Sequence, residues 1–211
     1  LISEKGTLTI DGNRDNMAVT VIGSSIFVTD SATVNIHDGA VIANNAKDGN
    51  ERAFICTRYT GEWLAQRAGG AAILILNGEV NMYGGIIENN WSRSERTVEV
   101  KEDGTETWHE HAGCGGAIYN CGNFNMYGGI IRANESLRGG AIYNDEIVRL
   151  FAGEISENIS HSYGGAIASS SSTEAQMFIG TEGESDNKMV FRKNVAETGG
   201  ALYSNTDSAI V

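Results

Sequence analysis

The chain repeats a short sequence pattern about every 24 residues, and this repeat limits the fold more than any other feature. One part of the pattern reads VNMYGGIIENN at residues 80–90 and returns in altered form at residues 34–45, 124–134 and 148–158. Another part, Gly-Gly-Ala, begins at Gly115, Gly139 and Gly164, with variants at Gly69 and Gly199. A fixed period of this kind predicts one structural unit per repeat, with the units stacked into a solenoid.

Each repeat consists of short runs in which apolar and polar residues alternate, as at Val34 and Ile36. A period of two predicts β-strands, and each repeat holds about three such runs between Gly or Asn turns. The chain has 27 Gly and no Pro, which fits tight turns between strands whose backbone groups are nearly all paired. We therefore predict an all-β fold, a right-handed parallel β-helix of about six to seven coils, whose hand follows the usual crossover rule.

We expect residues 1–211 to form a single domain, because a repeat array can extend without splitting into separate cores. The pattern is already under way at residues 7–12, near the start of the sequence. We therefore interpret the chain as a segment of a longer protein, with further β-helix coils or caps of the parent chain as neighbours.

Stacked repeats place equivalent residues in columns, about 4.8 Å apart. Three of these columns are apolar, and we expect them to form the core. The first holds Ile42, Ile87, Ile131, Ile155 and Phe191; the second holds Val34, Val80, Phe124 and Val148; the third holds Ile36, Met82, Met126 and Leu150.

A fourth column consists of asparagines three residues after each inner Ile or Phe. Its members are Asn45, Asn90, Asn134, Asn158 and Asn194. Asn tolerates left-handed turns, and its amide can bond to the next Asn along the stack, so we predict an asparagine ladder at a turn. A glycan-binding or metal-binding role is the alternative. The Asn-x-Ser sequences at Asn90, Asn134 and Asn158 follow from the repeat itself.

Long insertions interrupt the period between the column asparagine and the next Gly-Gly pair. Four residues separate these two features after Asn134, but 23 do so after Asn45 and 24 after Asn90. We predict two long loop insertions at one corner of adjacent coils, residues 46–68 and 91–113, and a shorter insertion near residues 173–183. Residues 97–109 alternate around Asp103-Gly104, which predicts a β-hairpin with a two-residue turn.

The aromatic residues of these insertions are the leading candidates for a binding site. They are Tyr59, His109 and all three tryptophans of the chain, which are Trp63, Trp91 and Trp108. Either the loops fold over each other and bury the tryptophans in a satellite core, or the tryptophans lie exposed on a rigid scaffold. Exposed aromatic side chains dominate protein hot spots and stack on ligand rings. The wall after Gly-Gly-Ala is a second candidate, with Tyr119 and Tyr143, then Asn120, Asn144 and Ser169, expected to face outward.

A zinc site is the only cofactor that the sequence suggests. His109 and His111 lie two residues apart on a predicted strand, so we expect them on one face, which they share with Val98 and Val100. Together with Cys114 they have ligand types that bind zinc. Three cysteines are too few for a disulfide framework. Cys56 is the expected partner of Cys114 or Cys121 if a bridge forms, and buried or free thiols are the alternative.

The net charge of −12 argues against nucleic acid and anionic membranes as partners, because both are bound through clustered Lys and Arg. No run approaches the roughly 18 apolar residues of a membrane span, so we expect no membrane insertion of this segment. Asp145 and Glu146 are the only adjacent acids on the predicted wall, and no nucleophile with a neighbouring base is visible. No catalytic residue is therefore proposed.

Gly-Gly-Ala-Ile at residues 115–118, 139–142 and 164–167, together with Phe191-Arg192-Lys193-Asn194, resembles the Gly-Gly-Ala-Ile and Phe-x-x-Asn repeats of the chlamydial polymorphic outer-membrane proteins. It is similar more broadly to the β-helical surface adhesins of bacteria. In that family such repeats build a passenger domain used in adhesion. The resemblance covers about residues 25–205, and it implies a parallel β-helix and a secreted module at the bacterial cell surface.

These observations favour a non-catalytic binding or adhesion module of an extracellular bacterial surface protein. We expect it to recognise a host protein or a glycan through the corner that carries the two long loops. A regular wall offers the same few groups on every coil, whereas the insertions gather distinct aromatic and charged residues. The alternatives are a polysaccharide-active enzyme, either a lyase or a hydrolase, on a β-helix, and a purely structural stalk.

Overall fold

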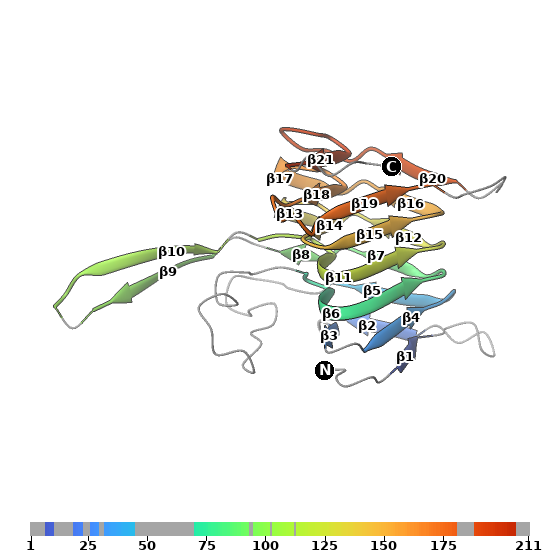
Figure 1. The fold of residues 1–211 in the computed structure, drawn as a ribbon, viewed down its shortest axis with the longest axis horizontal. Coiled ribbons are helices and arrows are strands. Elements are labelled where there is room, and N and C mark those ends of the chain that lie inside the picture. The colour runs from blue at the N-terminus through green and yellow to red at the C-terminus, as the bar shows by residue number, and fades with distance from the viewer. Residues whose placement is uncertain are drawn as a thin grey trace.

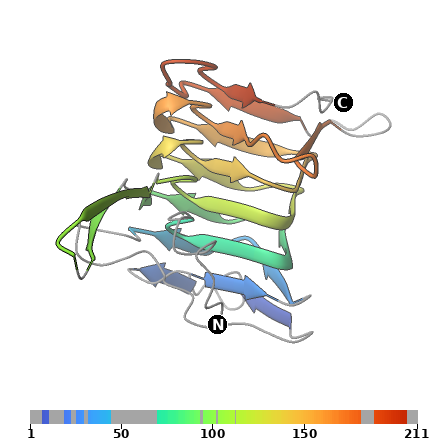
Figure 2. The same ribbon diagram turned by 60° about the vertical axis from the view of Figure 1, so that its left-hand side comes forward.

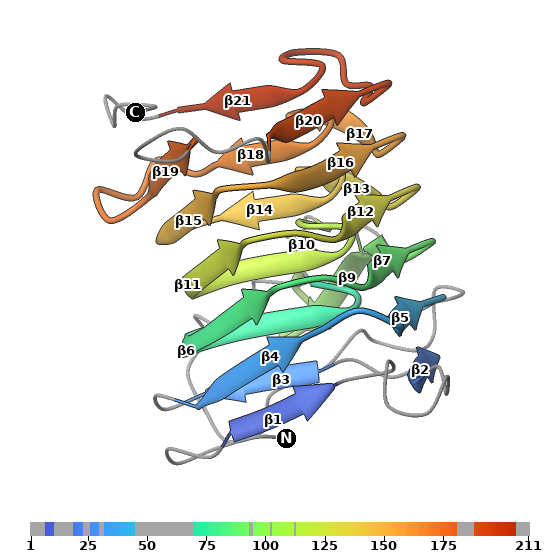
Figure 3. The same cartoon turned by 90° about the vertical axis from the view of Figure 1, so that its right-hand side faces the viewer.

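Stacked parallel β-strands form most of the computed structural model (Figures 1 and 3). The structure describes residues 7–10, 19–22, 26–29, 32–44, 70–92, 95–101, 103–111, 113–180 and 188–205. These residues contain 21 strands and no helix, so none of them belongs to a helix that could cross a membrane. The prediction of an all-β parallel solenoid is confirmed.

The largest sheet, sheet A, has ten strands. They are β1 (Thr7–Ile10), β3 (Ile26–Thr29), β4 (Thr33–Ile36), β6 (Ile73–Met82), β11 (Ile118–Met126), β14 (Ile142–Asn144), β15 (Ile147–Leu150), β18 (Ile167–Ser169), β19 (Gln176–Ile179) and β21 (Leu202–Ser204). The long strand β11 pairs with both β14 and β15. In the middle coils this part of the wall is one long strand, such as β11. In the coil that follows, a bend divides it into two shorter strands, β14 and β15.

Two further sheets run beside sheet A. Sheet B has six strands, one for each of six coils: β2 (Val19–Ile22), β5 (Ala40–Ala43), β7 (Ile86–Glu88), β12 (Ile130–Arg132), β16 (Gly153–Ser156) and β20 (Met189–Arg192). Sheet C has three: β8 (Trp91–Ser92), β13 (Glu135–Arg138) and β17 (Ile159–Tyr163). Where all three sheets are present, the chain passes from A to B to C and back to A, as predicted for three short strands per repeat.

The strand register confirms the three apolar columns. Ile131 pairs with Ile87 on one side and Ile155 on the other, and all three are fully buried. The columns that contain Phe124 and Met126 are aligned in the same way and are also fully buried. One continuous core therefore runs along the inside of the stack, and it reaches the partly buried Phe191 in the last coil.

The two glycines of each Gly-Gly pair serve different purposes. The first has a left-handed backbone, with φ of 64° at Gly115 and 65° at Gly139. The second lies against the next coil, because a Cβ added to Gly116 would overlap the carbonyl oxygen of Gly140. Glycine alone tolerates both conditions without strain, which explains the most regular motif of the sequence.

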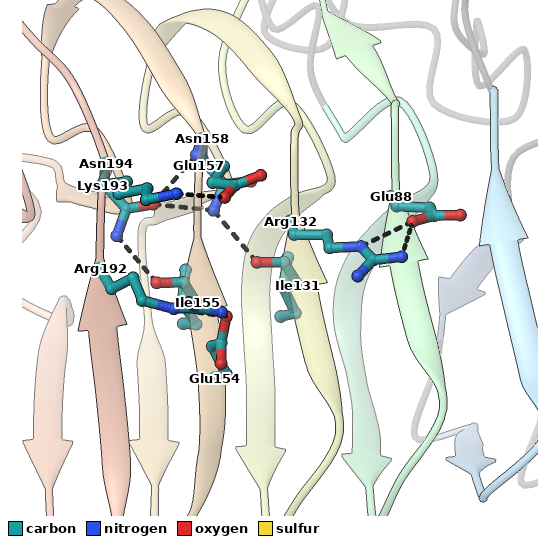
Figure 4. Close-up of polar contacts among 10 residues, drawn as sticks. All are labelled: Glu88, Ile131, Arg132, Glu154, Ile155, Glu157, Asn158, Arg192, Lys193 and Asn194. Atoms are coloured by element: carbon teal, nitrogen blue, oxygen red, sulfur yellow. Dashed lines mark hydrogen bonds and ion pairs between the residues drawn. The ribbon is translucent and has the colours of Figure 1, made fainter.

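The predicted asparagine column is a hydrogen-bonded ladder. Nδ2 of Asn90 donates to Oδ1 of Asn134 at 2.9 Å, Asn134 donates to Asn158 at 2.9 Å, and Asn158 donates to Asn194 at 2.9 Å. Nδ2 of Asn158 also donates to the main-chain oxygen of Ile131 at 3.1 Å (Figure 4). The ladder thus joins successive coils and satisfies carbonyl groups of the inner strands.

The left-handed residue of this turn is the one before each ladder asparagine. Positive φ values between 53° and 57° occur at Asn44, Asn89, Ala133, Glu157 and Lys193. The expectation that the ladder asparagines take the left-handed conformation is therefore wrong, since the turn needs that conformation one residue earlier. Asn45 lies outside the described residues.

The Asn-x-Ser sequences arise from two adjacent structural columns. Their asparagines are at most 1% exposed. The serines two positions later form a second buried column along sheet C: Ser92, Ser136 and Ser160. Oγ of Ser136 donates to the carbonyl oxygen of Gly139 at 2.9 Å. The asparagine and the serine of each Asn-x-Ser sequence are therefore buried, so the folded chain does not expose these sequences for N-glycosylation.

Another polar column lies inside the wall of sheet A. Asn120 and Asn144 are fully buried, so the expectation that they face outward with the tyrosines is wrong. Neighbouring residues of a strand face opposite sides, and the outward Tyr119 therefore requires an inward Asn120. Nδ2 of Asn120 donates to Oδ1 of Asn144 at 2.8 Å and to the carbonyl oxygen of Ile147 at 3.0 Å. These amides satisfy the backbone where β14 bends into β15.

The boundaries of two insertions differ from the prediction. Trp91 and Ser92 pair with β13, so the second insertion begins after Ser92. The third insertion is divided by β19, which pairs with β15 in the wall. Residues 46–68, the first insertion, lie outside the described residues.

Candidate binding surface

The strands β9 (Glu95–Val100) and β10 (Glu106–His111) form the predicted antiparallel hairpin. The hairpin leaves the stack after β8 and extends away from the wall (Figures 1 and 2). In the described part of the chain these strands form a sheet of two that joins no other sheet. Each strand therefore has one edge that no described strand covers.

Both ends of the hairpin are fixed to β13. On the entering side, Ser92 pairs with Ser136. On the returning side, the carbonyl oxygen of Gly113 accepts hydrogen bonds from the backbone nitrogens of Leu137 and Arg138 at 3.0 and 3.1 Å. The chain thus leaves and re-enters the coil opposite consecutive residues of one strand. The insertion projects from a continuous wall without interrupting it.

The hairpin turn is longer than the two residues predicted. The backbone nitrogen of Lys101 donates to the carbonyl oxygen of Thr105 at 2.9 Å, and that of Gly104 donates to the carbonyl oxygen of Lys101 at 2.9 Å. With φ of 81° at Gly104, this is a three-residue loop that ends in a left-handed glycine. Oδ1 of Asp103 accepts a hydrogen bond from the backbone nitrogen of Thr105, and this bond lowers the pKa of the Asp103 carboxyl.

The register of the hairpin contradicts one predicted face. His109 lies opposite Thr97 and His111 lies opposite Glu95, whereas Val98 lies opposite Trp108. Directly opposite residues share a face of an antiparallel pair. The expectation that the two histidines share the face of Val98 and Val100 is therefore wrong.

Beside the base of the hairpin, a second apolar cluster lies on the outer side of sheet A. Its buried members are Leu74, Leu76, Cys114, Tyr119, Cys121, Tyr143 and Ala168, with Tyr163 and Tyr203 packed against them. Cys114 and Tyr163 precede a Gly-Gly pair, and Tyr119 follows one, so the cluster spans the corner that these glycines form. The described members of this cluster belong to the wall and include no tryptophan, so the burial of the loop tryptophans in a satellite core stays a prediction.

Tyr119 and Tyr143 are brought together in this cluster, but they are not an exposed recognition surface. They are 3% and 9% exposed, and their ring centroids lie 5.3 Å apart. The hydroxyl of Tyr119 donates to Oδ2 of Asp145 at 2.5 Å, and Sγ of Cys121 lies 3.5 Å from the same oxygen. Burial first, and then the nearby Cys114 and Asp145, raise the pKa of Tyr143 well above its usual range.

The adjacent acids Asp145 and Glu146 do not form an open catalytic pair. Asp145 is 7% exposed, and its Oδ2 already accepts the hydroxyl of Tyr119. Burial raises the pKa of Glu146, with smaller contributions from the Glu174 and Asp145 carboxylates. In the described residues no group of three or more His, Cys, Asp or Glu side chains is arranged to hold a metal ion.

The remaining candidate residues are only partly placed. Trp91 is half-buried in β8 and lies opposite Glu135. Trp108, His109 and His111 are placed by the backbone of β10. Tyr59, Trp63 and Cys56 lie outside the described residues, so a bridge from Cys56 stays a prediction. The zinc site of His109, His111 and Cys114 also stays a prediction.

The structure also reveals a stack of rings that we did not single out in the sequence. His37, Tyr83, Tyr127 and Phe151 follow β4, β6, β11 and β15 on four consecutive coils. Their neighbouring ring centroids lie 5.0, 5.0 and 4.8 Å apart, with interplanar angles of 21°, 9° and 11°. Tyr83 and Tyr127 are 47% and 42% exposed. The signal was present, since all four residues directly follow an inner apolar residue at the same position of the repeat.

Comparison with known proteins found no matching family model, no matching curated protein and no matching solved structure.

Proposed function

We propose that the chain is a non-catalytic binding module of an extracellular surface protein, and that the β9–β10 hairpin is its recognition element. The observation that carries this proposal is the attachment of the hairpin to the wall. It is fixed at both ends to β13 and extends away from the wall (Figure 2). A two-stranded hairpin is only marginally stable in water, and an element that stands clear of the core adds little to the stability of the fold.

The edges of the hairpin that no described strand covers favour a protein ligand over a glycan. An exposed strand edge presents a row of backbone donors and acceptors, which an extended peptide can pair with as an added strand. The exposed residues at the tip include Val100, which is 61% exposed, so the end of the hairpin also offers apolar surface.

The charge of the hairpin favours a ligand segment that carries Lys or Arg. Residues 95–111 contain six acidic residues and two basic residues, Arg96 and Lys101. A surplus of carboxylates attracts positively charged partners and repels acidic ones. The resemblance to bacterial surface adhesins supports a host protein as the source of such a segment and the bacterial cell surface as the location.

A peptide array and a glycan array test this proposal on the same immobilised protein. We expect the wild-type chain to bind extended peptides that contain Lys or Arg, and a variant in which a short turn replaces residues 97–110 to lose that binding. Val190→Ser is a matched control, because Val190 is 42% exposed on the outer side of sheet B and belongs to no part of the proposed site.

Three outcomes would contradict the proposal. If the variant without the hairpin bound peptides as well as the wild type does, the binding site would have to lie on another surface. Binding of glycans alone would exclude strand addition. Release of reducing ends or unsaturated sugars from a polysaccharide would favour the alternative, a lyase or hydrolase.

A further inference from the structure

The ring stack stops at Phe151 because the next coil has glycine in the ring position. The backbone nitrogen of Gly180 donates to the carbonyl oxygen of Leu150 at 2.9 Å, as that of Phe151 donates to Met126 at 2.8 Å and that of Tyr127 to Met82 at 2.8 Å. Gly180 is therefore in register with the stack, one coil beyond Phe151.

No described residue fills the space that a side chain at this position would enter. A Cβ built on Gly180 meets no heavy atom within 4 Å. By contrast, the ring of Tyr127 is covered on both faces, by Tyr83 and by Phe151. Phe151 is thus a terminal ring, and the face that it turns toward Gly180 has no stacked neighbour among the described residues.

Phe178 and Arg149 lie beside this vacant ring position. Phe178 lies two residues before Gly180 on β19, and Arg149 lies two residues before Phe151 and pairs with Phe178 in the register. Cζ of Arg149 is 5.7 Å from the centroid of the Phe178 ring. Its Nη1 donates to Oδ1 of Asn123 at 3.1 Å, which holds the guanidinium against the wall.

We propose that the vacant position above Phe151 binds an aromatic ring, namely a Trp or Tyr side chain of a protein partner. The stack itself supplies the template, since three successive ring pairs already lie about one strand spacing apart. A ring face flanked by a second aromatic side chain and an arginine is also the kind of surface on which Trp and Tyr hot spots pack.

A sugar ring fits this position less well. A sugar needs hydrogen-bonding groups around its edge as well as an apolar face beneath it. Of the two side chains named above, Phe178 is apolar, and Arg149 supplies hydrogen-bond donors but no acceptor. The site is separate from the hairpin, because the hairpin is attached beside β13 of sheet C, whereas Phe151 and Gly180 follow β15 and β19 of sheet A. It therefore provides a second, independent contact for a partner.

Titration of the isotope-labelled chain with N-acetyl-tryptophanamide, followed by NMR, tests this proposal. We expect saturable shifts of the Gly180 amide and the Phe151 ring, with a dissociation constant on the order of 1 mM, as suits a single side chain. N-acetyl-leucinamide tests for non-specific apolar binding, and methyl β-glucopyranoside tests for a sugar site. Both are expected to bind at least about tenfold more weakly.

Two variants locate the binding. Phe151→Leu keeps apolar volume but removes the flat ring, and we expect it to weaken tryptophanamide binding at least about tenfold. Tyr83→Leu alters a ring whose faces are both covered, by His37 and Tyr127, and is expected to bind like the wild type. Circular dichroism verifies that both variants are folded. Absence of a saturable shift, undiminished binding by Phe151→Leu, or equal binding of the leucine or sugar probe would overturn the proposal.

Discussion

Oδ1 of Asn158 accepts two hydrogen bonds from Asn134 on the preceding coil, one from its backbone nitrogen at 3.0 Å and one from its Nδ2 at 2.9 Å. The same Nδ2 also donates to the carbonyl oxygens of Ile87 and Arg132, at 3.2 and 2.9 Å. A single buried side chain therefore joins three consecutive coils. At this turn the ladder adds side-chain hydrogen bonds to the backbone bonds between coils, such as that from the nitrogen of Glu135 to the carbonyl oxygen of Asn90 at 2.9 Å.

Asn134→Ala is expected to lower the free energy of unfolding by about 3 kcal/mol or more, because each buried group left without a partner costs about 1–3 kcal/mol. Asn194→Ala, at the partly exposed end of the ladder, should cost only about 1 kcal/mol, since water can replace part of the lost bonding. Urea denaturation measures both values. Equal losses in the two variants would mean that burial of the ladder does not matter.

Ile131→Ala is expected to cost about 2–5 kcal/mol, because Ile131 is fully buried between Ile87 and Ile155. Ile131→Asp should prevent folding, because it would bury a charge without a partner. Ile130→Ala is the matched control on the outer side of the same strand and should cost less than about 1 kcal/mol. Thermal and urea unfolding compare the stabilities of the variants. A greater loss for Ile130→Ala than for Ile131→Ala would contradict the assignment of Ile131 to the core side of sheet B.

Gly140→Ala is expected to unfold the chain or to cost more than about 3 kcal/mol, because the new Cβ would overlap the carbonyl oxygen of Gly165. Gly200→Ala occupies the equivalent position in the last described coil. Its Cβ would approach Asn194 no closer than 3.5 Å, so the cost should stay within about 0.5 kcal/mol. Melting temperatures distinguish the two variants. Tolerance of alanine at position 140 would contradict the close stacking of these glycines.

The phenol of Tyr143 should make stability fall at alkaline pH. Burial raises its pKa in the folded chain, so the folded state holds the proton more tightly than the unfolded state, whose pKa is about 10. The stabilisation is fully present below that unfolded pKa and is lost as pH rises toward the folded pKa, by at most about 1.4 kcal/mol per pH unit. Tyr143→Phe should have a flatter alkaline profile of unfolding free energy. An unchanged slope would show that this phenol is not the group responsible.

Much of the fold could be predicted from the sequence, because in a solenoid the local repeat and the long-range contacts follow the same rule. Once Ile87, Ile131 and Ile155 are aligned by sequence, their contact in space follows from stacking. The asparagine ladder was predictable for the same reason. The hairpin was predictable from a different signal, the alternation around Asp103-Gly104.

The candidate site was harder to predict because it depends on residues that break the repeat. Outward residues of a β-helix are exposed by default, yet Tyr119 and Tyr143 are buried where two walls meet at the Gly-Gly corner. The prediction that Asn120 faces outward is wrong because neighbouring residues of one strand face opposite sides. The predicted face of His109 is wrong because the register of a hairpin depends on the length of its turn, which is three residues and not two.

The central claim is that the wall provides stability and the hairpin provides recognition. The most direct test is the free energy of unfolding of the variant in which a short turn replaces residues 97–110, measured by urea denaturation against the wild type. The account predicts a difference within about 0.5 kcal/mol, as for surface changes away from the core. A loss of several kcal/mol would show that the hairpin stabilises the fold, and would contradict this division of roles between the wall and the hairpin.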